Sequence, residues 1–135
     1  MAKTYPLVIL TPEREFFKGD VYSLTVESID GQLCVLADHI PMVTALTAGV
    51  LQIEDSKGEH VAFHSQGFMQ VARDEVTLLA QTCEWPEEID ARRAQGAAKR
   101  AQERLSSHND AGRSTVALLR ALRRLQVKES IYKQK

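Results

Sequence analysis

The spacing of apolar residues changes at about position 85 of this 135-residue chain. Before that position, short runs alternate apolar and polar residues, which is the period of a strand with one buried face. Asp30-Gly31 is typical of a tight hairpin turn. Strands this short and this regularly spaced predict an antiparallel β-sandwich or barrel of about 80 residues. The expected strands are 4–10, 16–17, 21–26, 33–36, 42–46, 50–53, 61–64, 68–72 and 76–80, with further turns at 48–49, 56–58 and 73–74.

After position 85 the apolar residues follow the period of an α-helix. Pro86 suits the first position of a helix, where its missing N–H is not needed. Acidic residues at 87, 88 and 90 favour the positive end of the helix dipole. Asp90 and Arg93 lie three residues apart on one helical face, so an ion pair is the simplest interpretation of both. We therefore expect the first helix to begin at Pro86.

The helical region is predicted to fold as an αα-hairpin. The first helix carries a stripe of mostly small residues, which permits close approach of another helix, and Gly96 within it costs about 1 kcal/mol relative to alanine. Residues 106–112 break the pattern, and a second helix is expected from about 114 towards 131. Two helices bury too little to be stable alone, so they should lean on the sandwich, a ligand or a partner. The stripe consists of Ala94, Ala97, Ala98, Ala101 and Leu105, and the second helix has Leu118, Leu119, Leu122 and Leu125 on one side.

Together these patterns predict an α+β chain in two parts: an N-terminal antiparallel β-sandwich over 1–84, followed by a C-terminal α-helical hairpin over 85–135. The charge divides at the same place. Residues 1–84 hold 5 Lys/Arg against 12 Asp/Glu, a balance of −7, whereas residues 85–135 hold 12 against 6, a balance of +6. The asymmetry indicates that the second part meets an anionic partner. A solvated helical surface would have the same composition.

Arginines form two rows with identical spacing in the helical region. Both rows have offsets of 0, 7 and 11 residues, which place three guanidinium groups within an arc of about 40° on each helix. Guanidinium groups bind phosphates and carboxylates through two-pronged hydrogen bonds. The rows could hold a polyphosphate, grip an acidic protein surface, or serve only as a solubilising face. The first row is Arg93, Arg100 and Arg104, and the second is Arg113, Arg120 and Arg124.

Catalytic and metal-binding signatures are missing from the sequence. The four histidines (39, 60, 64 and 108) have no spacing of a metal site or triad. His60 and His64 are interpreted as surface residues. No P-loop or dinucleotide fingerprint is present, and nucleic acid is disfavoured because aromatic residues near the arginines are few. We expect a non-enzyme that needs no metal.

The rest of the composition indicates a soluble protein of the cytosol. No apolar run approaches the roughly 20 residues of a membrane span, and the first residues lack the apolar core of a secretory signal. Cys34 and Cys83 are expected to be reduced and structural.

At these residues the chain resembles the epsilon subunit of bacterial F-type ATP synthase over essentially its whole length. Residues 36–46, Leu-Ala-Asp-His-Ile-Pro-Met-Val-Thr-Ala-Leu, are similar to the family's loop before a strand. Residues 89–94, Ile-Asp-Ala-Arg-Arg-Ala, match the family's Ile/Leu-Asp-x-x-Arg-Ala motif. That motif is specific when it opens a helical hairpin after a β-domain.

The resemblance implies a β-sandwich that docks on the gamma subunit and the ring of c subunits, peripheral to the cytoplasmic side of the cell membrane. The ring-facing region would be residues 30–41. Cys34 and Asp38 stand where glycines are common in the family, and Gln32 stands where glutamate is common; Asp38 could still adopt a left-handed conformation. The implied ring contacts are Asp30, Gln32, Asp38 and His39.

The resemblance also implies that the helices regulate ATP hydrolysis. They would extend into the catalytic head towards the alpha and beta subunits, or fold beside the sandwich and bind ATP as a regulatory ligand, not as a substrate. The implied ATP-binding residues are Glu84, Ile89, Asp90, Arg93, Ala94, Arg100, Arg113, Arg120 and Arg124.

Three functions remain open at this point. The first is the non-catalytic rotor subunit of the central stalk, with ATP-responsive helices. The second is a stand-alone nucleotide-sensing module without rotary partners. The third is an adaptor that grips polyanions.

Overall fold

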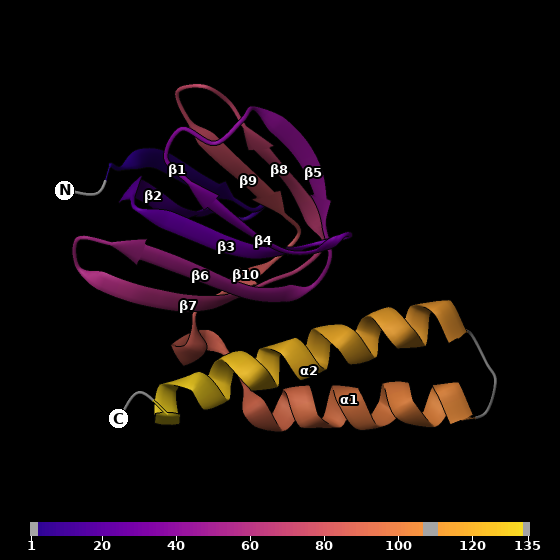
Figure 1. Cartoon of the computed structure of the whole chain (residues 1–135). Helices are drawn as coiled ribbons and strands as arrows, with labels where there is room; N and C mark the ends of the chain where they lie inside the picture. Colours follow the sequence, from indigo (N-terminus) through magenta and orange to yellow (C-terminus); the bar gives the residue numbers. More distant parts are fainter. Residues whose placement is uncertain (1–2, 107–110, 134–135) are drawn as a thin grey trace.

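The computed structural model describes residues 3–106 and 111–133, and it shows a β-sandwich followed by two helices (Figure 1). The predicted α+β fold class is confirmed. The strands are β1 (Tyr5–Leu10), β2 (Glu15–Val21), β3 (Ser23–Ser28), β4 (Gly31–Leu36), β5 (Met42–Leu46), β6 (Gly49–Asp55), β7 (Gly58–His64), β8 (Gly67–Val71), β9 (Val76–Ala80) and β10 (Cys83–Glu84). They are followed by the 3-10 turn η1 (Pro86–Glu88), α1 (Ala91–Ser106) and α2 (Ala111–Lys133).

The strands form one sheet that folds over on itself. The order is β10-β7-β6-β3-β5-β8-β9-β1-β2, with β4 paired to β3, and β2 approaches β6 across the fold. The prediction of a wholly antiparallel sheet is wrong at one pair, because β1 runs parallel to β9. β10 was not expected, and Val21 ends β2 instead of opening the next strand. The hairpin predicted at Asp30-Gly31 is confirmed, but its two-residue loop is Ile29-Asp30, and Gly31, with a positive φ of 118°, already pairs with Ser28.

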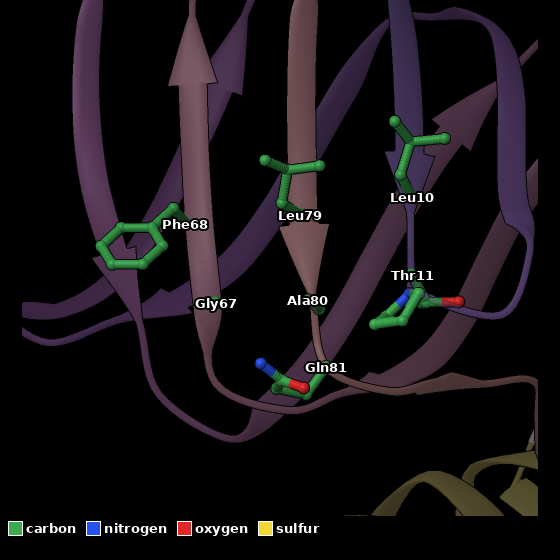
Figure 2. A pocket seen from close by; sticks show the side chains of 8 residues that line it. Leu10, Thr11, Gly67, Phe68, Leu79, Ala80 and Gln81 are labelled. Carbon is green, nitrogen blue, oxygen red and sulfur yellow. The ribbon is translucent and has the colours of Figure 1, made fainter.

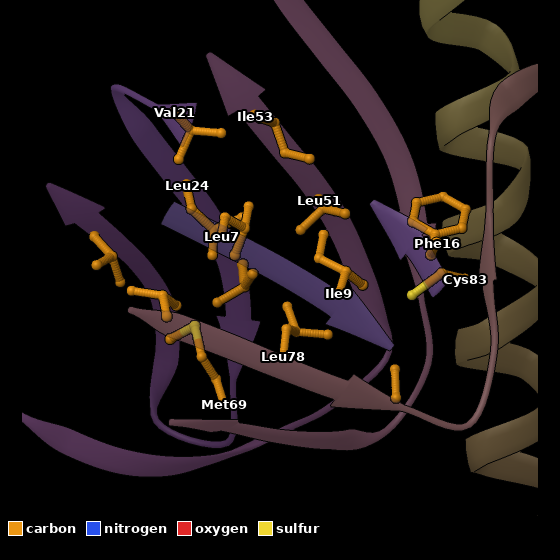
Figure 3. Packing of buried hydrophobic residues seen from close by; sticks show 14 of the residues in the cluster. Leu7, Ile9, Phe16, Val21, Leu24, Leu51, Ile53, Met69, Leu78 and Cys83 are labelled. Carbon is orange, nitrogen blue, oxygen red and sulfur yellow. The ribbon is translucent and has the colours of Figure 1, made fainter. Parts of the chain in front are cut away.

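Alternate residues of the strands build a core between the two layers (Figure 3). Leu7 and Ile9 of β1, Leu24 of β3, Leu51 of β6 and Leu78 of β9 have no exposed surface. Burying each such side chain stabilises the fold by about 1.5–3 kcal/mol. This core belongs to the sandwich alone, so the helices are not needed to complete it.

The junction differs from the prediction that a helix begins at Pro86. Pro86 opens a 3-10 turn instead, and Ile89 after it is extended, with φ −84° and ψ 124°. α1 then begins at Ala91, because the carboxylate of Asp90 accepts the Arg93 backbone N–H at 3.1 Å and so caps the helix. The predicted Asp90–Arg93 ion pair is therefore replaced, among the residues that the structure describes, by a hydrogen bond from the Arg93 backbone to the Asp90 carboxylate.

The helices lie folded beside the sandwich (Figure 1). α2 packs on β6, β7 and η1, and α1 packs on α2. Ala94 and Ala101 of the predicted stripe are buried, as is Ala121 of α2. The expectation that the hairpin leans on the sandwich is confirmed. Neither described helix is both long and apolar enough to span a bilayer.

Candidate functional site

A small apolar cluster joins α2 to the sandwich. Its buried members are Ala48, Phe63, Ile89 and Val127, of which Phe63 and Val127 have no exposed surface. Leu119 packs at its edge. The predicted leucine side of α2 is only partly correct, because Leu122 is 49% exposed while Val127 is buried. Ile89, an implied ligand-binding residue, thus forms part of the seam between the two parts of the chain.

Arg124 of α2 lies over this seam. Its guanidinium donates to one carboxylate oxygen of Glu84, from Nε at 3.0 Å and from Nη2 at 2.9 Å. The same guanidinium lies 4.6 Å from the centre of the Phe63 ring. These hydrogen bonds join two charged groups, which makes them stronger than bonds between neutral groups, and the ring contact adds a cation–π attraction. Two of the implied ATP-binding residues, Glu84 and Arg124, therefore hold each other when the helices are folded down.

Two guanidinium groups beside Arg124 have unsatisfied donors. The Nε atoms of Arg120 and Arg123 are buried and have no hydrogen-bond partner among the residues that the structure describes. Arg123 does donate from Nη1 to Gln126 at 3.0 Å. A buried guanidinium N–H without a partner is unusual, and an anion or water is the ordinary way to satisfy it. Arg120 was expected at the site, whereas Arg123 falls outside the 0, 7, 11 spacing and was missed.

The remaining implied ATP-binding residues lie on α1 or outside the described side chains. Arg93 and Arg100 are exposed, and Ala94 is buried. The Ala94 N–H donates to the Asp90 carbonyl oxygen at 3.0 Å, which closes the first turn of the helix. The side chain of Arg113 is not among those that the structure describes. The structure therefore brings Glu84, Ile89 and Arg124 together at the seam, buries the Nε atom of Arg120 one helical turn before Arg124, and places Arg93 and Arg100 on α1.

The implied ring contacts fall into two separate places. Asp30 and Gln32 lie at the β3–β4 hairpin tip, where Ser28 pairs with Gly31. Asp38 and His39 follow the opposite end of β4, about 17 Å away for a six-residue strand. Asp38 has the left-handed φ of 66° that the sequence allowed, and its carboxylate accepts from Lys3 Nζ at 3.0 Å. The two pairs therefore lie at opposite ends of one strand, and they remain predicted contacts.

An exposed apolar row was not predicted. Cross-strand pairing aligns Leu10 of β1, Leu79 of β9 and Phe68 of β8 on the outer surface (Figure 2). Phe68 is 61% and Leu79 49% exposed, and they line an open apolar groove of about 410 Å³. The sequence signal is the adjacent apolar pairs Phe68-Met69 and Leu78-Leu79. Neighbouring residues of a strand point to opposite faces, so one apolar residue of each pair must lie on the outer face. Exposed apolar patches are typical of interaction surfaces, so this row is a candidate docking face.

His64 is buried, so its interpretation as a surface residue is wrong. Its Nε2 accepts the Glu27 backbone N–H at 3.2 Å, and its Nδ1 donates to the Ser65 carbonyl oxygen at 3.1 Å. Gly49 makes room for the ring, because a Cβ there would lie 3.1 Å from Nε2. Burial lowers the pKa of His64; the hydrogen bond to Ser65 opposes the shift, and the nearby Arg123 charge adds to it.

Stability should fall as the pH drops below the ordinary His64 pKa of 6.5. The folded state holds this ring neutral, whereas the unfolded chain takes up a proton, so lower pH favours unfolding. Urea denaturation at pH 7.5 and 5.5 measures the effect. We expect the wild type to lose more stability over this range than His64→Gln, which cannot titrate. Equal losses in the two proteins would show that His64 is not held neutral.

Both cysteines are free, as expected, but only Cys83 has the buried position of a structural residue. Cys34 is exposed on β4, and Cys83 is buried. Burial raises the pKa of the Cys83 thiol to about 12, with the neighbouring Arg14 opposing the shift, so the thiol stays protonated. Within the described ranges no three His, Cys, Asp or Glu side chains gather as metal ligands do.

Known proteins match both parts of the chain. The ATP synthase delta/epsilon chain β-sandwich domain matches residues 4–86, and the long α-helix domain of the same family matches residues 87–129. An ATP synthase epsilon chain of Caldanaerobacter subterraneus subsp. tengcongensis is 47% identical over 131 residues, covering 94% of this chain and 95% of that one. One from Clostridium kluyveri is 40% identical over 130 residues, covering 94% and 98%.

A solved structure shares the fold. It is a chain in the cryo-EM structure of the Euglena gracilis mitochondrial ATP synthase, OSCP/F1/c-ring in rotational state 1. The TM-score is 0.72 at 22% identity, over 97% of this chain and 81% of that one. The β-sandwich and the helices that follow it thus agree with the two matching domains in type and order. The chain belongs to the delta/epsilon chain family of ATP synthase, as a non-catalytic, epsilon-type subunit of that complex.

Proposed function

We propose that this epsilon-type subunit joins the catalytic head to the c-subunit ring in the central stalk, and that its helices regulate ATP hydrolysis by binding ATP. The sandwich docks on the gamma subunit and the ring at the cytoplasmic side of the membrane. The helices fold beside the sandwich when ATP is bound and extend towards the alpha and beta subunits when it is not. ATP acts as a regulatory ligand.

The observation that carries the ATP proposal is the pair of unsatisfied buried Nε donors on Arg120 and Arg123. They lie on the same helix as Arg124, whose guanidinium is already placed by Glu84 and Phe63. A triphosphate would supply the missing acceptors and the negative charge. Because these arginines are brought to the seam only when α2 lies on the sandwich, ATP would stabilise the folded state by mass action.

Titration calorimetry with ATP on the isolated chain tests this proposal. Arg120→Ala is expected to weaken binding by about tenfold or more, because a hydrogen bond to a charged group contributes about 1.5–3 kcal/mol. Arg92→Ala removes an exposed arginine of α1 outside the implied site and serves as the matched control. Absence of binding at millimolar ATP, or equal affinity in Arg120→Ala and wild type, would refute ATP binding. The stalk role would survive either result.

The gamma-docking face is proposed to be the apolar row of Leu10, Phe68 and Leu79. Mixed with purified gamma subunit, the wild-type chain should co-elute on size exclusion, and Phe68→Asp should reduce the complex strongly, since it places a charge in the groove. Ile40→Asp is the control, because it changes an exposed apolar residue elsewhere on the sandwich, 79% exposed against 61% for Phe68. Equal complex formation by both variants would place the interface on another face.

The proposed ring contacts are Asp30 and Gln32 at one end of β4 and Asp38 and His39 beyond its other end.

A further inference from the structure

Arg14 connects the start of the chain to the segment that leads into the helices. It precedes β2, yet its Nη2 atom reaches the Cys83 carbonyl oxygen at 3.3 Å and a Glu88 carboxylate oxygen at 2.7 Å. These contacts span 69 and 74 residues of sequence. One guanidinium therefore touches both ends of the segment 83–88.

The same segment is also held by aromatic stacking. The rings of Phe16 and Trp85 stack with their centres 4.3 Å apart and 19° between their planes. The Arg14 guanidinium lies 5.1 Å from the centre of the Phe16 ring. Phe16 is a buried member of the sandwich core, so Trp85 is attached to the part of the molecule that does not depend on the helices.

Hydrogen bonds within residues 85–88 make the segment a closed unit. The Glu88 oxygen that Arg14 contacts also accepts the Trp85 N–H at 2.9 Å, and the Glu88 N–H donates to the Trp85 carbonyl oxygen at 2.9 Å. Arg14, Trp85 and Glu88 are thus mutually connected. None of these contacts involves α1 or α2.

From Ile89 onward the chain is attached to the helices and not to Arg14 or Phe16. The Ile89 side chain packs in the seam cluster with Val127 of α2, and the next residue, Asp90, caps α1. If α2 left the sandwich, Ile89 would lose its helical partner, whereas every contact of Arg14 would remain. Glu84 would lose Arg124, and Pro86 would lose the Lys128 ammonium that its carbonyl accepts at 3.0 Å. Both residues would still be fixed through their neighbours.

We propose that Arg14, Phe16, Trp85 and Glu88 form a clamp that keeps residues 83–88 on the sandwich, so that the helices pivot at Ile89–Asp90. Residues up to Glu88 would thus stay with the sandwich when the helices move. A role of the clamp in regulation rests on the proposed function, whereas the contacts that form the clamp do not. A fixed pivot would let the helices leave without disturbing the sandwich face beside them.

The single tryptophan of the chain makes the clamp measurable, because intrinsic emission reports Trp85 alone. The full-length chain is studied without ATP or partners, which separates this test from failure of the proposed function. Emission maximum and hydrogen exchange of the Trp85 and Glu88 amides are recorded. The variants are Arg14→Ala, Glu88→Gln and Val127→Lys, the last of which places a charge in the seam to release α2.

The clamp predicts opposite behaviour in the two classes of variant. Arg14→Ala and Glu88→Gln should shift Trp85 emission to the red and speed exchange of both amides by about fivefold or more. Val127→Lys should speed exchange along α2 while the Trp85 emission and both amides stay at wild-type values. Lys3→Ala removes an exposed ion pair, Lys3–Asp38 at 3.0 Å, and should change none of these readouts.

Either of two results would overturn the proposal. A red shift of Trp85 in Val127→Lys that accompanies release of α2 would place the pivot before Trp85. Wild-type exchange in both Arg14→Ala and Glu88→Gln would show that the ion pair does not fasten the segment. Glu88→Gln keeps the size of the side chain, so it provides the test should Arg14→Ala fold poorly.

Discussion

Replacing Gly67 by alanine should destabilise the sandwich by about 3 kcal/mol, a large part of the total for a domain of this size. A Cβ at Gly67 would collide with the Leu79 carbonyl oxygen and lie 2.7 Å from the Ala80 Cα. These are backbone atoms of β9, which pairs with β8 on one side and β1 on the other. The strand cannot withdraw without breaking ladder hydrogen bonds, so the clash is not relieved by a side-chain rotation.

Urea denaturation measures this loss, and Gly19→Ala is the matched control. Gly19 is also within a strand, but a Cβ there would meet its nearest neighbour, the Phe17 ring, at an ordinary 3.5 Å. We expect the control to stay within about 1 kcal/mol of wild type. Equal stability of the Gly67 and Gly19 variants would show that β8 and β9 do not approach as closely as described.

Replacing Val127 by lysine should detach the helices while the sandwich stays folded. Val127 is fully buried between Phe63 and Ile89. The positions of Arg123, Arg124 and Lys128 on the same helix make a further positive charge repulsive. Burying an uncompensated charge costs several kcal/mol, and a two-helix unit has little else to hold it. The sandwich core lies in a separate cluster and should survive.

Hydrogen exchange measured by mass spectrometry distinguishes the two parts. In Val127→Lys, protection should fall along α2 and stay at wild-type values in β1, β8 and β9. Leu122→Lys introduces the same charge on the same helix at a position that is already 49% exposed, and it should leave α2 protected. If α2 is as well protected from exchange in Val127→Lys as in Leu122→Lys, the seam does not hold the hairpin on the sandwich.

Local pattern was sufficient for most elements of the sandwich. Strands β5, β6, β8 and β9 lie within a few residues of the predicted runs, because alternation reports which face of a strand is buried. The parallel β1–β9 pair and the two-residue β10 were not predictable. They join segments far apart in the chain through backbone hydrogen bonds that leave no local signature. The helix start was misplaced because Pro86 opens a separate 3-10 turn that ends at the extended Ile89, and Asp90 caps α1.

The sequence predicted several residues of the candidate site but not how they are arranged in space. The arginine spacing identified Arg120 and Arg124, whereas Arg123 required the folded position of α2 to show that its Nε is buried. The burial of His64 likewise depends on Gly49 and on the Glu27 backbone, which no spacing rule connects to it. The resemblance implied ring contacts at Asp30 and His39, and only the structure shows that they lie near opposite ends of β4.

By itself, the sequence determined the order of the two parts, their opposite charges, the position of most strands and the family to which the chain belongs. These properties are carried by residue type and by neighbours within a few positions. Only the tertiary structure decided which charges meet: Arg124 with Glu84, and Arg14 with Glu88. Each pair lies 40 or more residues apart, so its formation depends on how the sheet closes and where α2 packs, and these are set by the packing of the whole chain.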